Sequence, residues 1–218
     1  MISGSTVEPF LWLYGIPGCG KTILSSTIIE DVLYHYHDPT MAVIFFYFDF
    51  NDVEKQQYEK MLRSLITQLS LRCTSTPTVL AALFSSCMNG ERQPTSDTLL
   101  TTLQQMIQEF DEIFVILDAL DECKERTELL EDIKKIAGWK TELHILVTSR
   151  REKDIEDSLD SLANNQRKVC IQSALVNDDI RAYIQKRLQS DPNLKRWRNK
   201  LEVQKEIETK LMGKADGM

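Results

Sequence analysis

The segment from Leu11 to Val32 reads LWLYGIPGCGKTILSSTIIEDV. It begins with four apolar or aromatic residues, passes through a turn with three glycines and a proline, and continues after a lysine and a threonine in a helical pattern. Residues 15–22, GIPGCGKT, fit the pattern G-x-x-x-x-G-K-[ST]. Glycines let the backbone turn its N–H groups inward, which makes an anion site at the N-terminus of a helix. The segment therefore predicts a strand, a phosphate-binding loop and a helix in succession.

Each residue type of this loop has a role in binding a nucleoside triphosphate. We expect Lys21 to reach the β- and γ-phosphates and the Thr22 hydroxyl to be a ligand of Mg²⁺. The alternative is an ordinary glycine-rich turn with a chance lysine, and the flanking strand and helix disfavour it. The expected cofactor-binding residues are Gly15, Ile16, Pro17, Gly18, Cys19, Gly20, Lys21 and Thr22.

Apolar runs of strand length alternate with amphipathic segments of helix length along most of the chain. The predicted strands are 10–14, 42–50, 113–117, 143–149 and 168–174, and the predicted helices are 21–34, 53–73, 98–110, 125–139 and 153–162. Nearly continuous apolar strands that alternate with helices are typical of a parallel sheet covered on both faces. The sequence therefore predicts an α/β fold with a doubly wound, parallel sheet of five strands.

The pattern changes after Val176. Residues 177–189 and 194–212 form two amphipathic helical patterns, and no strand pattern follows. We expect a nucleotide-binding domain over 1–176 and the start of a truncated helical subdomain over 177–218.

Polar residues at two helix starts are candidate N-caps. Ser96 or Asp97 is expected to cap the helix at 98–110. Asn177 or Asp178 is expected to cap the first helix of the C-terminal segment.

Asp118 follows the apolar run IFVIL, where a P-loop protein needs a carboxylate for its magnesium ion. The alternative role is a helix cap after a buried strand. The next residue is Ala119, at a position where many P-loop ATPases carry a glutamate base. Asp121 and Glu122 come slightly later and are candidates for polarising the attacking water, so we expect slow hydrolysis. Their alternative role is to favour a helix N-terminus.

The segment LHILVTSRR ends another apolar strand in polar residues. Thr148, Ser149 and Arg150 should lie at the carboxyl edge of the sheet, where ligands bind in such folds. Arg150 is a candidate contact of the γ-phosphate if its strand lies between those of the P-loop and Asp118. The alternative is a solvated loop cation, which suits Arg151 better.

The bulk composition sets limits on function and location. The chain has 218 residues and a formal net charge of −7, which argues against general nucleic-acid binding but leaves room for one nucleotide. Its five cysteines form no C-x-x-C pair, which disfavours a disulfide framework or a zinc site and fits a reducing cytosol. The apolar runs are shorter than the roughly 20 residues of a membrane span. We expect a soluble, cytoplasmic protein.

The histidines and Cys19 are residue types that can bind metals or undergo redox chemistry, but their positions in the sequence do not favour these functions. His35, His37 and His144 lack the spacing of metal ligands. Cys19 lies near a lysine and a helix N-terminus, so a redox role is one hypothesis, but a small side chain filling the loop is favoured.

A basic run lies near the end of the chain. Lys195, Arg196, Arg198 and Lys200 surround Trp197. The spacing favours a solvated helix face over an RNA site.

Taken together, GIPGCGKT, IFVILDALDEC and LHILVTSRR resemble the NACHT family of signal-transducing NTPases. The stretches FFYFDFND and NDDIRAYI resemble its fungal branch, whose full-length members often carry ankyrin or WD repeats downstream. The resemblance extends from Phe10 to Met218. It implies the strand order 5-1-4-3-2, then a helical subdomain and a winged helix.

The resemblance also implies how the protein works. Gly15, Gly18, Gly20, Lys21 and Thr22 would bind phosphate, Asp118 would bind Mg²⁺, and Arg150 would sense the γ-phosphate. Members of the family are closed with a diphosphate, and exchange for a triphosphate permits oligomerisation.

The expected function is that of a switch in a larger receptor. It would bind ATP or GTP, hydrolyse it slowly, and control self-association of an NLR-like receptor with an upstream effector, in innate immunity or heterokaryon incompatibility. The alternative is a turnover-driven P-loop ATPase, such as an AAA-type remodeller or a motor.

Overall fold

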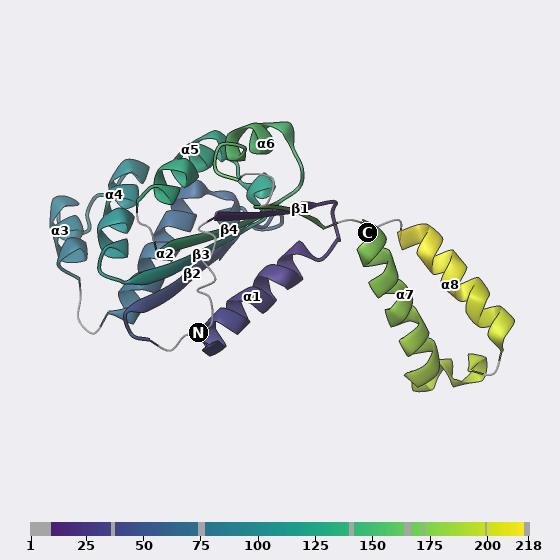
Figure 1. Cartoon of the computed structure of the whole chain (residues 1–218). Helices are drawn as coiled ribbons and strands as arrows, with labels where there is room; N and C mark the ends of the chain where they lie inside the picture. Colours follow the sequence, from purple (N-terminus) through teal and green to yellow (C-terminus); the bar gives the residue numbers. More distant parts are fainter. Residues whose placement is uncertain are drawn as a thin grey trace, which may run out of the picture.

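The computed structural model describes residues 10–35, 38–73, 77–139, 142–163, 167–171, 173–198 and 200–215. A parallel sheet with helices on both faces forms the larger part, and a pair of helices extends from it (Figure 1). None of the described helices is both long and apolar enough to cross a membrane. His37, considered above as a metal ligand, lies outside the described residues.

Five strands form the sheet. They are β1 (Phe10–Gly15), β2 (Met41–Tyr47), β3 (Glu112–Asp118), β4 (Leu143–Ser149) and β5 (Lys168–Ile171). Their order is β2-β3-β4-β1-β5, and every neighbouring pair is parallel. The doubly wound fold and the order 5-1-4-3-2 are therefore confirmed.

Strand β4 lies between β1 and β3. Its residues pair with both neighbours, with Thr148 opposite Leu13 and Val147 opposite Leu117. Because the strands are parallel, the segments that follow β1, β3 and β4 meet at one edge of the sheet. The condition on which the prediction for Arg150 depends is met.

The α-helices are α1 (Lys21–His35), α2 (Tyr58–Arg72), α3 (Thr78–Ser86), α4 (Ser96–Ile107), α5 (Arg126–Ala137), α6 (Lys153–Leu159), α7 (Ser173–Ser190) and α8 (Leu201–Ala215). Three short 3-10 helices are η1 (Glu54–Gln56), η2 (Leu120–Glu122) and η3 (Pro192–Trp197). Figure 1 shows α1 on one face of the sheet and α2, α4 and α5 on the other.

Each face of the sheet has its own apolar cluster. Trp12 and Ile44 belong to the larger cluster, which α2, α4, α5 and α6 complete. Their chain neighbours Leu13 and Val43 point the other way and pack with Ile29 of α1. The division follows from the alternation of side chains along a strand.

Several predicted boundaries were wrong by a few residues. Strand β2 ends at Tyr47 rather than Phe50, and α4 ends at Ile107 rather than Phe110. The N-cap of α4 is Thr95, whose Oγ1 accepts the N–H of Thr98 at 3.3 Å. Thr95 has the extended backbone that an N-cap needs. The predicted caps, Ser96 and Asp97, are already inside the helix.

The start of the C-terminal helical pair also differs from the prediction. Strand β5 ends at Ile171, and α7 begins at Ser173 within the segment expected to be strand. The expected caps, Asn177 and Asp178, therefore lie within the helix. Because α7 also crosses Val176, the helical segment begins earlier than the sequence indicated.

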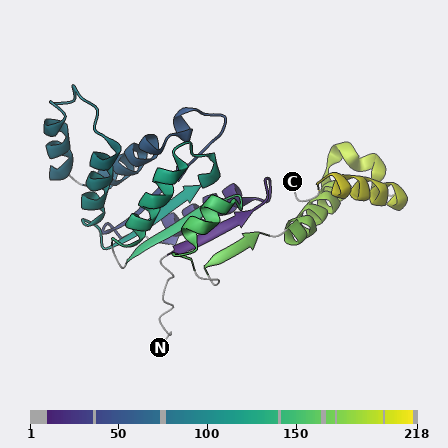
Figure 2. The ribbon, with the colours of Figure 1, turned by 90° about the horizontal axis from the view of Figure 1, so that it is seen from above.

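The predicted helix at 194–212 is divided in two. The basic run lies on η3 and on the turn before α8, not on a continuous helix face. The guanidinium of Arg196 lies 4.6 Å from the Trp197 ring centroid, and the Lys200 ammonium lies 5.5 Å from it. Figures 1 and 2 both show α7 and α8 side by side and away from the sheet.

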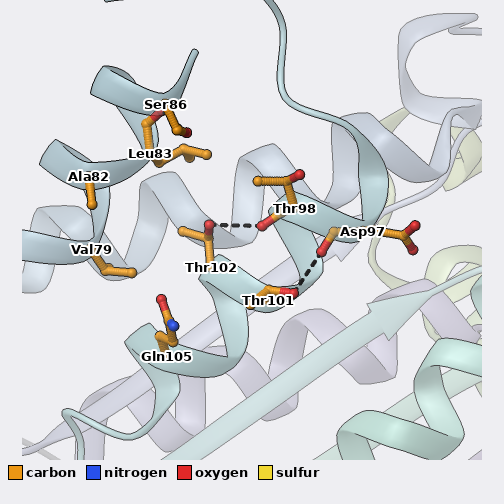
Figure 3. A pocket seen from close by; sticks show the side chains of 9 residues that line it. All are labelled: Val79, Ala82, Leu83, Ser86, Asp97, Thr98, Thr101, Thr102 and Gln105. Carbon is orange, nitrogen blue, oxygen red and sulfur yellow. Dashed lines mark hydrogen bonds between the residues drawn. The ribbon is translucent and has the colours of Figure 1, made fainter.

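Helix α3 has no counterpart among the predicted helices. It packs against α4 beside a hollow of about 400 Å³, where Ala82 and Leu83 face Thr98 and Thr102 (Figure 3). A larger hollow of about 820 Å³ continues to residues just before β2 and β3. The starts of parallel strands lie at the edge opposite their ends, so this hollow is remote from the P-loop.

Candidate functional site

The loop between β1 and α1 has the backbone that its glycines allow. Gly18 and Gly20 have φ angles of +75° and +89°, which side chains other than glycine rarely adopt. Position 15 has no room for a side chain, because a Cβ there would lie 2.7 Å from Cys19 Sγ and 2.9 Å from the carbonyl oxygen of Ile171. A Cβ on Gly20 would meet nothing within 4 Å.

Helix α1 begins at the end of this loop, at Lys21. The first N–H groups of a helix have no acceptor within it, and the helix dipole adds partial positive charge there. The Lys21 ammonium lies against the loop and donates to the carbonyl oxygens of Gly15 and Ile16, both at 2.9 Å. Together these groups have the charge and the free donors that an anion requires.

Cys19 is part of this loop. Its side chain is buried, and its Sγ lies 3.6 Å from Lys21 Nζ. Burial favours the role of filling the loop over the redox hypothesis.

Asp118 ends β3 and is 2% exposed. Thr22 Oγ1 donates to its Oδ2 at 2.7 Å. Ser25 Oγ and Thr148 Oγ1 donate to its Oδ1 at 2.8 and 2.7 Å. In the described part of the chain, no cationic side chain forms an ion pair with this carboxylate. The negative charge of a buried carboxylate whose hydrogen-bond donors are all neutral is not compensated by a protein cation. A metal cation could supply this compensation.

The donor set at Asp118 fits Mg²⁺ in particular. Mg²⁺ prefers oxygen ligands and is held by one or two carboxylates together with substrate phosphates. Thr22 and Asp118 supply a hydroxyl and a carboxylate oxygen beside the anion site. Among the residues that the structure describes, no group of three or more His, Cys, Asp or Glu could hold a metal. The pair therefore fits a phosphate-bound Mg²⁺ rather than a metal held by protein alone.

The residue after Asp118 turns the chain sharply. Ala119 has φ 60° and ψ 53°, the left-handed conformation that is uncommon outside glycine. Its N–H donates to Thr148 Oγ1 at 2.9 Å, which ties the turn to β4. The turn leads directly into η2 and brings Asp121 and Glu122 to the carboxyl edge.

Asp121 contacts Arg150, in the segment that follows β4. Its Oδ1 accepts the N–H of Arg150 at 2.9 Å, and its Oδ2 lies 3.0 Å from Arg150 Nε. Arg126 donates to its carbonyl oxygen. Because its side chain is only 4% exposed, Asp121 is better suited to hold Arg150 than to polarise water.

Glu122 is the more available carboxylate. Its Oε2 accepts the N–H of Phe50 at 2.8 Å. Burial raises the pKa of Glu122 above its ordinary value and the charge of Asp121 adds to this, while the bond from Phe50 opposes it. A raised pKa makes Glu122 a stronger base than an exposed glutamate.

One hollow of about 380 Å³ unites these segments. The residues that line it are Pro17, Gly18, Gly20, Lys21, Thr22, Ile23, Phe50, Ala119, Asp121, Glu122, Thr148 and Arg150. They include members of the P-loop, of the turn after Asp118 and of the end of β4. Cys19 and Asp118 are buried and are not among the lining residues.

Two further contributors were missed from the sequence. Phe50 is 65% exposed and lines the hollow. In the sequence it was only the last residue of the predicted strand 42–50. Ser25 contacts Asp118 and lay unnoticed in the first helix.

The two described histidines considered as metal ligands lie elsewhere. His35 Nδ1 is 3.3 Å from Asp31 Oδ1. His144 Nε2 is 2.9 Å from Glu112 Oε1, and Glu112 is the first residue of β3, at the opposite edge from the hollow.

Comparison with solved structures supports the fold. The ORC1 protein of Aeropyrum pernix, in a complex with DNA, gives a TM-score of 0.53 at 12% identity over 81% of this chain and 44% of that chain. Drosophila ORC bound to GC-rich DNA and Cdc6 gives 0.45 at 11% identity over 76% of this chain and 50% of that chain. The chain thus spans half or less of the length of these proteins. At such identities the likeness to the Aeropyrum protein is one of fold alone.

Comparison with family models gives a match, and comparison with curated sequences gives none. The family model described as "Nephrocystin 3, N-terminal" matches residues 1–150 of the 218, a range that holds the P-loop, Asp118 and Arg150. The chain has a P-loop NTPase fold and belongs to this nephrocystin 3 N-terminal family.

Proposed function

We propose that this chain binds a purine nucleoside triphosphate with Mg²⁺ and hydrolyses it slowly, as the nucleotide switch of a signalling protein of NACHT type. The observation that carries the proposal is the single hollow lined by the P-loop, the turn after Asp118 and Arg150. These elements come from three separate parts of the chain, and the sheet order brings them together.

The P-loop would hold the phosphates. The N–H groups at the start of α1 are directed to this site, and Lys21 would exchange its bonds to the carbonyls of Gly15 and Ile16 for bonds to phosphate oxygens. Thr22 and Asp118 would hold Mg²⁺, which neutralises charge on the phosphates when bound.

Glu122 and Arg150 would act at the γ-phosphate. Glu122 lines the hollow and would accept a proton from the attacking water. Arg150 lines the same hollow and would contact the γ-phosphate after turning from Asp121. Slow hydrolysis is proposed because Ala119 stands where a glutamate base would directly follow the strand-end aspartate.

The wider role rests on the NACHT-like motifs. The part of the chain that ends with β5 would be the nucleotide-binding domain, and the part from α7 onward the start of a helical subdomain. In a longer, cytoplasmic, NLR-like receptor, exchange of diphosphate for triphosphate would permit self-association. Such a receptor would join an upstream effector to downstream ankyrin or WD repeats. Immunity or heterokaryon incompatibility is the process that this architecture suggests.

Nucleotide binding is tested with the purified chain. The mass of any copurifying nucleotide identifies the base and the phosphate state together. Calorimetry with ATP, GTP and their diphosphates, each with Mg²⁺, then gives the affinities. Lys21→Ala should weaken triphosphate binding by about 100-fold or more, because charge-assisted hydrogen bonds are lost.

The matched control is Lys134→Ala, which removes an exposed lysine of α5. It should bind triphosphate as the unaltered chain does. Equal affinities for Lys21→Ala and the unaltered chain would refute the P-loop assignment. Steady-state hydrolysis separates the switch from a turnover-driven remodeller, since brisk turnover would favour the latter.

A further inference from the structure

Two buried hydroxyl groups hold Asp118 from different elements. Ser25 is on α1, one turn after Thr22, and Thr148 is near the end of β4. Both side chains are 0% exposed, and both donate to Oδ1 of Asp118. Thr22 donates to the other oxygen, Oδ2. The two oxygens of the carboxylate therefore have separate partners.

Ser25 occupies a position where an apolar residue would otherwise be expected. The buried residues of α1 are Ser25, Ile29 and Val32, which follow each other at helical spacing. A hydroxyl in such a stripe costs free energy unless it finds a hydrogen-bond partner. Ser25 Oγ lies 2.8 Å from Asp118 Oδ1 and 3.1 Å from the carbonyl oxygen of Thr22, so the shorter of its two contacts is the one with Asp118.

The Thr148 hydroxyl contacts both residues of one peptide bond, Asp118 and Ala119. Its Oγ1 donates to the side chain of Asp118 and accepts the N–H of Ala119. It therefore fixes the direction of the carboxylate and the left-handed turn that follows it. Only the hydroxyl explains both contacts, because a methyl group makes neither.

We propose that Ser25 and Thr148 are positioning residues of the Mg²⁺ site, which tether Oδ1 of Asp118 so that Oδ2 remains beside Thr22 for the metal. This inference rests on the nucleotide-binding function proposed above. Partners that orient a metal ligand, without touching the metal, typically affect metal affinity by about 10- to 100-fold.

The test measures metal binding rather than turnover. Mn²⁺, a paramagnetic stand-in for Mg²⁺, is titrated into the full chain with saturating nucleoside diphosphate, and free Mn²⁺ is followed by electron paramagnetic resonance. Ser25→Ala and Thr148→Val should each weaken Mn²⁺ binding by about tenfold or more. Their affinity for the diphosphate in EDTA should fall far less, so that the loss depends on the metal.

Two further variants complete the design. Ser26→Ala is the matched control, because the hydroxyls of Ser25 and Ser26 both contact the carbonyl oxygen of Thr22. The other contact of Ser26 is with the Tyr47 hydroxyl rather than with Asp118. It should bind Mn²⁺ as the unaltered chain does. Thr148→Ser keeps the hydroxyl and should restore most of the affinity that Thr148→Val loses.

The outcomes separate this inference from the proposed function. If the unaltered chain binds nucleotide and Mn²⁺ but Ser25→Ala and Thr148→Val titrate like Ser26→Ala, the inference is wrong and the proposed function stands. Equal losses with and without metal would mean a structural role and would also overturn it. If the unaltered chain binds no nucleotide, both fall together. Ser25→Ala is mild within a helix, so it decides the matter if Thr148→Val does not fold.

Discussion

Arg150 Nε lies 3.0 Å from Asp121 Oδ2, and the N–H of Arg150 donates to Oδ1 of the same carboxylate. The two side chains differ in freedom, since that of Asp121 is 4% exposed and that of Arg150 is 46% exposed. Arg126 bonds the carbonyl of Asp121 and pairs with Glu152 and Asp154, which joins the same two loops a second time. Asp121 is therefore the fixed partner, and the Arg150 guanidinium is the one able to turn to a phosphate.

Replacing Arg150 should change how the chain discriminates nucleotides. In Arg150→Ala, the triphosphate loses a charge-assisted contact that the diphosphate never made, so the affinity ratio should narrow by about tenfold or more. Calorimetry with a diphosphate and a non-hydrolysable triphosphate measures this ratio. Arg151→Ala is the matched control, because Arg151 pairs with Glu156 and lies over Tyr14. A ratio that is the same in both variants and the unaltered chain would end the sensor assignment.

Asp118→Asn tests the proposed metal ligand itself. The amide keeps the shape of the carboxylate but not its charge, so nucleotide affinity with Mg²⁺ should fall while affinity in EDTA stays nearly constant. The affinities are measured by calorimetry in the two conditions, with circular dichroism to check folding. A loss of the same size with and without metal would contradict the role in metal binding.

Asp121 and Glu122 should differ when each loses its charge. Glu122→Gln should slow single-turnover hydrolysis by about 100-fold or more, which is the usual contribution of a general base. Asp121→Asn should act through Arg150 instead and mainly alter the ratio of triphosphate to diphosphate affinity. The reverse assignment would follow if Asp121→Asn abolished hydrolysis and Glu122→Gln did not.

The pH dependence of hydrolysis provides a separate check on Glu122. Burial raises its pKa, and a base acts only when deprotonated. As the pH is lowered, single-turnover hydrolysis should therefore begin to fall at a higher pH than an exposed glutamate would give. Glu122→Gln should remove this acidic limb. An acidic limb that persists in Glu122→Gln belongs to another group.

The fold could be predicted because its signals are local and strong. Strand β4 was predicted to the residue, since an apolar run bounded by polar residues leaves little choice. Helix α3 was missed, because the short segment 78–86 is apolar but lies half-exposed on α4, without the polar face that marks a surface helix. Thr95 was missed as a cap because neighbouring Ser96 and Asp97 are equally good candidates, and only the backbone conformation chooses between them.

Candidate site residues could be recognised where characteristic residue types follow the end of a strand. They were missed where their role depends on a contact with a residue far away in the sequence. The P-loop, Asp118 and Arg150 were proposed as site residues from their own segments alone. The bond from Phe50 to Glu122 and that from Ser25 to Asp118 join residues far apart in the chain, so their pairing depends on the tertiary fold. The different contacts of Asp121 and Glu122, and so the different roles proposed for them, depend on the same information.

A buried pair away from the site allows a test of the fold itself. The Tyr58 hydroxyl donates to Oδ2 of Asp132, and the two side chains join α2 to α5. Tyr58 is 1% exposed and Asp132 is 4% exposed. Tyr58→Phe leaves the carboxylate with one donor fewer and should lower the free energy of unfolding by about 1–3 kcal/mol. Urea unfolding measures it, with Tyr34→Phe, at a 75% exposed tyrosine, as the control.

The same pair predicts a dependence on alkaline pH. Burial raises the pKa of Tyr58 well above its ordinary value of 10.0, and the bond to Asp132 adds to this. Below that ordinary value both states keep the proton, so the contribution of the pair to stability is complete. Above it, the unfolded chain loses the proton and the folded chain keeps it, so the free energy of unfolding falls by up to about 1.4 kcal/mol per pH unit. Tyr58→Phe lacks this loss, so the gap between it and the unaltered chain should narrow as the pH rises. A gap that stays constant through this range would mean that Tyr58 titrates alike in both states.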